Sequence, residues 1–104
     1  MNETRGCALE RLQQWYSAQC DGEWEHGYGV RIESLDNPGW SLAIDLTGTS
    51  VRLEVGRKVE VERDDDDWYQ IWVSDDRGSL SLLAACGPLN LSEVVEIVLE
   101  WLEG

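Results

Sequence analysis

The first segment of the chain, residues 6–20, repeats its apolar side chains with the period of an α-helix. Leu9, Leu12 and Tyr16 are separated by three or four residues, which places them on one face of a helix. Polar residues fill most of the other positions, and Asp21-Gly22 then ends the pattern with two poor helix formers. The spacing predicts an amphipathic helix that docks on the rest of the protein through Leu12 and Tyr16.

From residue 28 onward the period changes to two, which is typical of strands with one buried face. Asp36-Asn37-Pro38-Gly39 separates two such runs with strong turn-forming residues, so these runs predict a hairpin. Further turns follow at regular intervals. The pattern predicts an antiparallel, mostly meandering sheet of about six short strands, at residues 28–33, 40–46, 51–55, 59–61, 68–74 and 80–85.

The last segment returns to the helical period. Asn90 is a candidate N-cap, and Glu93 follows three residues later in the manner of a capping box. Docking is expected through Val95, Val98 and Leu102. A helix, a run of strands and a helix predict an α+β fold in a single domain, residues 1–104, with both helices on one face of the sheet.

The charge balance narrows the function classes. Lys and Arg number 8 against 21 Asp and Glu, a formal net charge of −13 at pH 7. Binding to nucleic acid or to an anionic membrane depends on basic side chains, so neither is expected as a partner. A basic protein is expected instead. Nothing in the sequence sets the oligomeric state.

The cysteines and the hydropathy predict a cytoplasmic protein without cofactors. Three Cys residues in 104 show no Cys-x-x-Cys spacing, which favours reduced thiols over disulfides or a zinc site. No apolar run reaches the ~18 residues of a membrane span, and the first residues lack the pattern of a secretory signal. No metal site is expected.

The densest group of reactive side chains lies between the first helix and the first strand. Carboxylates and imidazole can act in acid–base chemistry, ligate a metal or contact a partner, and they can equally form a hydrogen-bonded corner. All three readings stay open from the sequence. The candidate partner-binding residues here are Asp21, Glu23, Trp24, Glu25 and His26.

A second candidate surface lies at the turn of four consecutive aspartates and in the strand after it. The aspartates lack the ligand spacing of a calcium loop, so a solvated turn or a contact with a basic partner are the alternatives. If Tyr69, Ile71 and Val73 face the core, the tryptophans of this strand stand on the outward face unless a loop covers them. The candidate residues are Asp64, Asp65, Asp66, Asp67, Trp68 and Trp72.

Many of the Trp, Gly and Pro positions resemble those of the immunity protein 53 family. The resemblance covers most of the chain and is tightest over residues 15–46. A later junction is similar to the family's Gly-Gly-Pro pattern, with Cys86 where the first glycine is expected. The matching segments are Trp15-Tyr16, Gln19-Cys20-Asp21-Gly22, Trp24-Glu25-His26, Tyr28-Gly29-Val30, Ile32, Leu35 to Trp40, Ile44-Asp45-Leu46 and Cys86 to Leu91.

The resemblance implies a bacterial protein, not an enzyme, that neutralises a cognate polymorphic toxin by binding it. If that toxin is a nuclease, its substrate groove is basic and carboxylates could occupy it. Two alternatives come from the residues themselves. One is a small acidic hydrolase or metal-dependent enzyme centred on residues 21–28, and the other is an acidic adaptor domain that binds a basic host protein.

Overall fold

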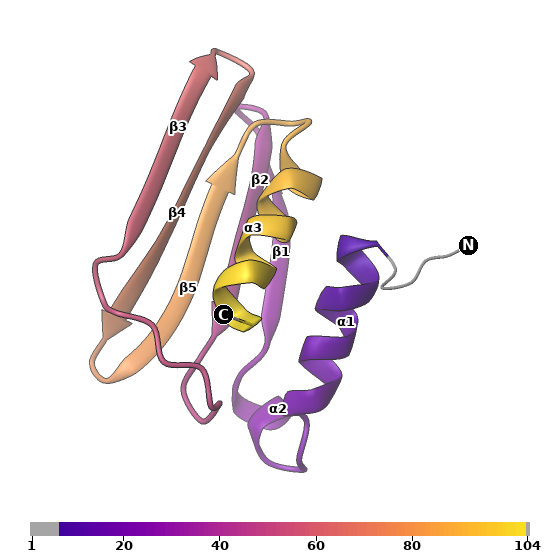
Figure 1. The fold of residues 1–104 in the computed structure, drawn as a ribbon, viewed down its shortest axis with the longest axis vertical. Coiled ribbons are helices and arrows are strands. Elements are labelled where there is room, and N and C mark those ends of the chain that lie inside the picture. The colour runs from indigo at the N-terminus through magenta and orange to yellow at the C-terminus, as the bar shows by residue number, and fades with distance from the viewer. Residues whose placement is uncertain (1–6, 104) are drawn as a thin grey trace.

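Helices flank one side of an antiparallel sheet in the computed structural model, which describes residues 7–103 (Figure 1). The predicted α+β fold is confirmed, although Gly6, the predicted start of the first helix, lies outside the described residues. The helices are α1 (Ala8–Gln19), α2 (Trp24–Gly27) and α3 (Leu91–Glu103). The strands are β1 (Val30–Leu35), β2 (Gly39–Asp45), β3 (Lys58–Asp64), β4 (Asp67–Asp76) and β5 (Ser79–Cys86).

The sheet combines a hairpin with a three-stranded meander. Its strand order is β1-β2-β5-β4-β3, with every neighbouring pair antiparallel. β3, β4 and β5 follow one another as a meander, and the β1–β2 hairpin joins them through the β2–β5 pair. The connection 46–57 carries the chain across the end of the sheet, so β1 and β3 become its two edges (Figure 1).

The described residues form five strands where the sequence predicted about six, because residues 51–55 do not join the sheet. Val51 turns into the core, whereas Val55 is more than half exposed. Here side chains, rather than a neighbouring strand, form hydrogen bonds with the backbone N–H and C=O groups. The Thr49 hydroxyl accepts a hydrogen bond from the Val51 N–H, and the Arg52 guanidinium donates to the carbonyl oxygens of Thr49 and Val51.

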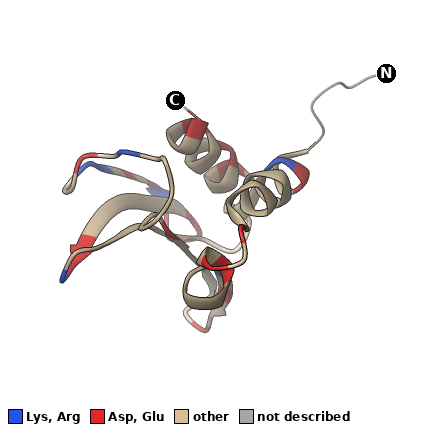
Figure 2. Cartoon of the chain, turned by 90° about the horizontal axis from the view of Figure 1, so that it is seen from below, with Lys and Arg blue, Asp and Glu red and all other residues tan. Residues whose placement is uncertain are grey.

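The core lies between the helices and one face of the sheet. The most deeply buried side chains come from β2 and the residue after it, from β4 and β5, and from α3. They include Ile44, Leu46, Ile71, Leu82 and Leu99. Both long helices lie on the same side of the sheet, as predicted (Figure 2). Among residues 7–103, no helix covers the opposite face of the sheet.

The two helices dock as predicted in α3 and only partly so in α1. Val95, Val98 and Leu102 are all buried. In α1, Leu12 is buried as predicted, but Tyr16 is 39% exposed and does not dock the helix onto the core. The Tyr16 ring instead lies at the end of the helix against Trp24 of α2, with ring centroids 5.9 Å apart.

Candidate functional site

The helix-free face of the sheet carries two tryptophans of β4. Tyr69, Ile71 and Val73 are buried beneath the helices, and Trp68 and Trp72 alternate with them on the other side, partly exposed. The conditional prediction about their direction is therefore confirmed. Their partial exposure also means that no described loop covers them completely.

Cross-strand pairing places carboxylates beside these tryptophans. In the register between β3 and β4, Glu62 lies opposite Trp68 and Lys58 lies opposite Trp72. Glu60 lies opposite Gln70, whose amide donates to the Glu60 carboxylate at 3.2 Å. Paired residues of an antiparallel sheet share a face, so the acidic and aromatic side chains form one surface.

Small and apolar side chains continue this surface across the sheet. Leu83 of β5 lies between Trp72 and Ala43 of β2, and Ala85 lies between Gln70 and Ser41. We call the whole surface the open face. It is defined by Arg31, Glu33, Ser41, Ala43, Lys58, Glu60, Glu62, Trp68, Gln70, Trp72, Leu83 and Ala85.

The four aspartates do not act as one group. Asp65 and Asp66 form the exposed turn between β3 and β4, and Asp64 accepts a hydrogen bond from the Asp66 N–H at 2.8 Å. Asp64 and Asp65 also line a shallow depression of about 220 Å³ together with Glu62 and Trp68. The acidic turn is thus continuous with the open face at its β3–β4 end.

Asp67 belongs to a separate network that ties the hairpin to α3. Its carboxylate accepts hydrogen bonds from Arg63 at 2.7 Å and from the Asn90 amide at 2.8 Å. Arg63 also donates to Glu93 at 2.8 Å. The hydrogen bond from Asn90, followed by that from Arg63, lowers the pKa of Asp67, and the bond from Arg63 lowers the pKa of Glu93.

Asn90 does more than the predicted helix cap. It immediately precedes α3, as expected of an N-cap, but its side-chain oxygen accepts a hydrogen bond from the Trp68 N–H. The predicted capping box does not form in that way. The Glu93 carboxylate accepts hydrogen bonds from Arg63 and from the Asn90 side chain, whereas the Asn90 backbone N–H donates to the Gly87 carbonyl. These residues connect the start of α3 to the start of β4.

In the cluster between α1 and β1, two of the carboxylates accept hydrogen bonds from nearby backbone N–H groups. The Asp21 carboxylate accepts hydrogen bonds from the N–H groups of Glu23 and Trp24, both at 3.0 Å, which lowers its pKa. The Glu25 carboxylate accepts from Asp21 and Gly22 at 3.0 and 2.8 Å, and backbone hydrogen bonds lower its pKa as well. These contacts build a corner, while Glu23 and His26 remain exposed.

Trp24 is buried, so the prediction that it is an exposed anchor is wrong. Its side chain is only 5% exposed. The indole N–H donates to the Thr47 carbonyl at 3.0 Å, and the ring packs edge-on against Trp15 with centroids 6.1 Å apart. The ring therefore fixes the corner to the connection after β2.

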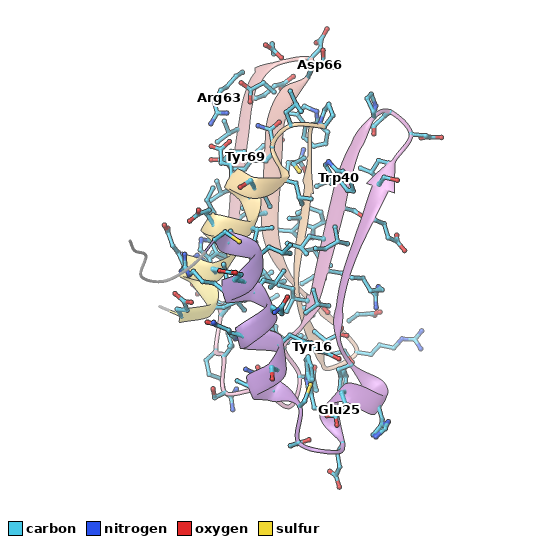
Figure 3. The ribbon with its side chains drawn as sticks, turned by 90° about the vertical axis from the view of Figure 1, so that its right-hand side faces the viewer. Tyr16, Glu25, Trp40, Arg63, Asp66 and Tyr69 are labelled. Atoms are coloured by element: carbon cyan, nitrogen blue, oxygen red, sulfur yellow. The ribbon has the colours of Figure 1, made fainter. Side chains whose placement is uncertain are left out.

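The two candidate surfaces lie far apart. Figure 3 places Glu25 and Asp66 at opposite ends of the molecule. The structure thus separates the predicted site residues into a corner with internal partners and a hairpin surface that faces solvent. Glu60, Glu62 and Gln70 join the second surface although the sequence did not single them out as site residues. Their alternation marked them as outward-facing, but only the strand register shows which tryptophan each one accompanies.

Two further properties of residues 7–103 bear on the function. No group of three or more His, Cys, Asp or Glu side chains in this range is arranged to hold a metal ion. None of its helices has the length and apolar character needed to cross a bilayer.

Comparison with known proteins gives one family. Residues 9–103, nearly the whole chain, match the family model described as Immunity protein 53. No match was found among curated proteins or among solved structures.

Proposed function

Because this chain belongs to the immunity protein 53 family, we propose that it binds a cognate bacterial toxin and neutralises it by stoichiometric contact. The observation that supports a binding role most directly is the open face, where two partly exposed tryptophans stand next to the exposed carboxylates of Glu60, which pairs with Lys58, and of Glu62. Such a surface is suited to holding another protein.

In the proposed interface, the tryptophans contribute most of the binding energy and slow dissociation. Trp68 and Trp72 project from the outward side of β4 with Gln70 between them, about 13 Å apart along the strand. The backbone of β4 is fixed by pairing on both sides, with β3 and β5. Large aromatic side chains on a rigid strand lose little entropy on binding, which is why Trp is enriched among the residues that dominate interface energies.

The carboxylates of the proposed interface raise the rate of association with a basic partner. Glu60 and Glu62 lie on the outward side of β3, and Asp65 and Asp66 project from the turn beyond them. A row of exposed carboxylates raises the rate of encounter with a basic surface and loses this effect as salt screens it. We propose a basic toxin domain as the partner. If the toxin is a nuclease, these carboxylates would occupy the groove that binds its substrate phosphates.

The corner between α1 and β1 supports the alternative functions less well. An acid–base enzyme centred on residues 21–28 needs a carboxylate that is free to exchange a proton with substrate. Asp21 and Glu25 each accept two backbone hydrogen bonds instead. Glu23 and His26 are exposed residues of this corner, and we retain them as a secondary contact surface.

The test is rescue of growth by the protein when it is co-expressed with the toxin encoded next to it, followed by binding kinetics with the catalytically inactivated toxin. Trp72→Ala is expected to raise the dissociation rate about 30-fold, which corresponds to about 2 kcal/mol. The combined Glu60→Gln, Glu62→Gln, Asp65→Asn variant is expected to slow association about tenfold at low salt and much less at high salt.

A matched control uses Glu54 of the connection 46–57 and Glu100 of α3, which are exposed and are not among the residues that define the open face. The Glu54→Gln, Glu100→Gln variant should bind and rescue like the wild type. Absence of binding by the wild-type protein would refute the proposed function. Full rescue by a variant lacking both tryptophans and the three carboxylates would refute the open face as the binding surface, but not toxin neutralisation itself.

A further inference from the structure

The outer edge of β1 is open to another strand. Within residues 7–103, β1 pairs only with β2 and forms one end of the sheet. Figure 3 views the molecule from this side, and no helix or other strand crosses in front of β1. An uncovered edge presents unpaired N–H and C=O groups that can pair with a second chain.

The hydrogen bonds to β2 reveal which residues of β1 present these groups. The Asp45 N–H donates to the Gly29 carbonyl at 3.0 Å, and Gly29 lies opposite Asp45 if the β1–β2 register is continued by one residue. In an antiparallel pair, residues alternate between bonding to the neighbour and pointing the other way. Val30, Ile32 and Ser34 therefore direct their backbone N–H and C=O groups toward the free edge.

We propose that this edge binds β1 of a second copy of the chain in an antiparallel, two-fold arrangement centred on Ile32. Outward-directed residues must then face one another, and Ile32 does so with its own copy while Val30 faces Ser34. Arg31 falls opposite Glu33 of the copy, and Glu33 opposite its Arg31. Opposite charges thus meet twice, in the closely spaced type of cross-strand pair.

Charge selects this register over its neighbours. A shift of one residue would pair outward-directed groups with groups that already bond to β2. A shift that keeps the alternation centres the pairing on Arg31 or on Glu33, and each of these registers sets two like charges against each other. Of these three registers, the one centred on Ile32 alone pairs outward-directed backbone groups and also sets opposite charges against each other.

The helix side of β1 offers apolar surface for the same contact. A groove of about 430 Å³ is lined by Leu9, Ile32, Trp40 and Leu89, among others, and Leu89 is 94% exposed. A second groove of about 450 Å³ continues along α1 past Tyr16 and Val30. A two-fold axis perpendicular to the sheet keeps the helices of both copies on one side. The Val30 and Ile32 side chains of each copy then lie at the mouth of the other's grooves.

The opposite edge is less suited to the same pairing. An antiparallel copy of β3 centred on Val61 would place Glu60 opposite Glu62, and a copy centred on Val59 would place Lys58 opposite Glu60, although Lys58 already lies within 3.7 Å of the Glu60 carboxylate of its own strand. Pairing through β1 also leaves the β3–β4 end of the open face free, since that end lies at the far edge of the sheet. Such a dimer would present two toxin-binding surfaces on one continuous sheet.

The experiment is sedimentation equilibrium of the full chain across a micromolar to millimolar range, at about 150 mM salt to limit long-range repulsion. The wild type should dimerise. Arg31→Glu and Glu33→Arg should each weaken dimerisation about tenfold or more, because every substitution occurs twice in the interface. The double variant Arg31→Glu, Glu33→Arg restores opposite pairs and should regain the wild-type affinity.

Matched controls separate the proposed pairing from net charge. Arg77→Glu and Glu54→Arg change the net charge by the same amounts at exposed positions outside β1, and they should alter dimerisation by less than twofold. Far-UV circular dichroism checks that each variant is folded. A wild-type chain that is monomeric up to millimolar concentration refutes the proposal, and so does a double variant that fails to recover.

Amide hydrogen exchange gives an independent readout of the register. At concentrations that favour the dimer, the amides of Val30, Ile32 and Ser34 should gain protection. Those of Arg31 and Glu33 should change little, because they already bond to β2. Dimerisation without this alternating pattern would place the interface elsewhere and refute pairing through β1.

Discussion

Replacement of Trp24 by alanine should unfold the protein more readily rather than remove a binding anchor. The ring is 5% exposed and packs against Trp15 and Tyr16. Its indole N–H donates to the Thr47 carbonyl, which joins α2 to the connection after β2. Gly48 adds to this packing, because a Cβ at that position would lie 3.3 Å from the indole ring.

The expected loss can be estimated from these contacts. Truncation of a buried Trp to Ala costs about 3–5 kcal/mol, against a total stability of about 5–15 kcal/mol for a single domain. Trp24→Phe retains an aromatic ring and loses the hydrogen bond, so it should cost about 1–2 kcal/mol. For a chain of this size, the alanine variant should lower the urea midpoint by roughly 2 M.

Urea denaturation followed by far-UV circular dichroism is the suitable assay, since the six tryptophans complicate fluorescence. Trp72→Ala provides the comparison, because its ring is partly exposed on the open face and should cost less stability. If Trp24→Ala leaves the urea midpoint unchanged and weakens toxin binding, the ring is a surface anchor after all. That outcome would contradict the structural role assigned here.

Three further predictions concern the core, the hairpin junction and the acid network. Leu12→Ala should lower the free energy of unfolding by about 2–5 kcal/mol, because the side chain is buried under α1, and an unchanged melting temperature would place it on the surface. Gly87→Ala should cost about 1–3 kcal/mol in urea denaturation, because a Cβ would collide with the backbone oxygen of Asp66, and a stability equal to wild type would disprove that close approach. The two carboxyl groups bound by Arg63 have pKa values below their ordinary 3.8 and 4.5, so their stabilisation is present above those values and is lost as the pH falls through the lower folded values. Arg63→Gln should therefore reduce the loss of stability below about pH 4.5, and parallel acid-unfolding curves would argue against the network.

The sequence predicted the elements well where local pattern and tertiary packing agree. Alternation identified the strands that pair, and the stripe of α3 identified its buried face. The predicted strand at residues 51–55 failed because alternation reports a half-buried segment, not a hydrogen-bonded partner. Val51 and Leu53 pack on the core as a strand would, yet side chains of Thr49 and Arg52 hold the local backbone.

The candidate site was harder to predict, because hydrogen bonds between distant residues decide which charges are free. Asp65 and Asp67 are two residues apart and equivalent in the sequence. Asn90 and Arg63 reach only Asp67. In the same way, Trp24 is surrounded by charged residues in the sequence, but Thr47 gives its indole N–H a partner from 23 positions away. Neither composition nor local pattern identifies hydrogen-bond partners that are distant in the sequence.

The strand order explains how one sheet can offer two different surfaces. The connection 46–57 carries the chain across the sheet and leaves the two strands with the most charged outward rows, β1 and β3, at its edges. Charged edge strands protect a sheet from indiscriminate pairing, but the protection depends on the order of the charges. Glu60 and Glu62 of β3 oppose each other when two copies of the strand pair about Val61, and we propose that they serve a basic partner instead. The Arg31–Glu33 pair of β1 sets like charges against each other in the two neighbouring registers that keep the alternation, and opposite charges in the one centred on Ile32, so the same charges favour a specific contact when the second strand is its own copy.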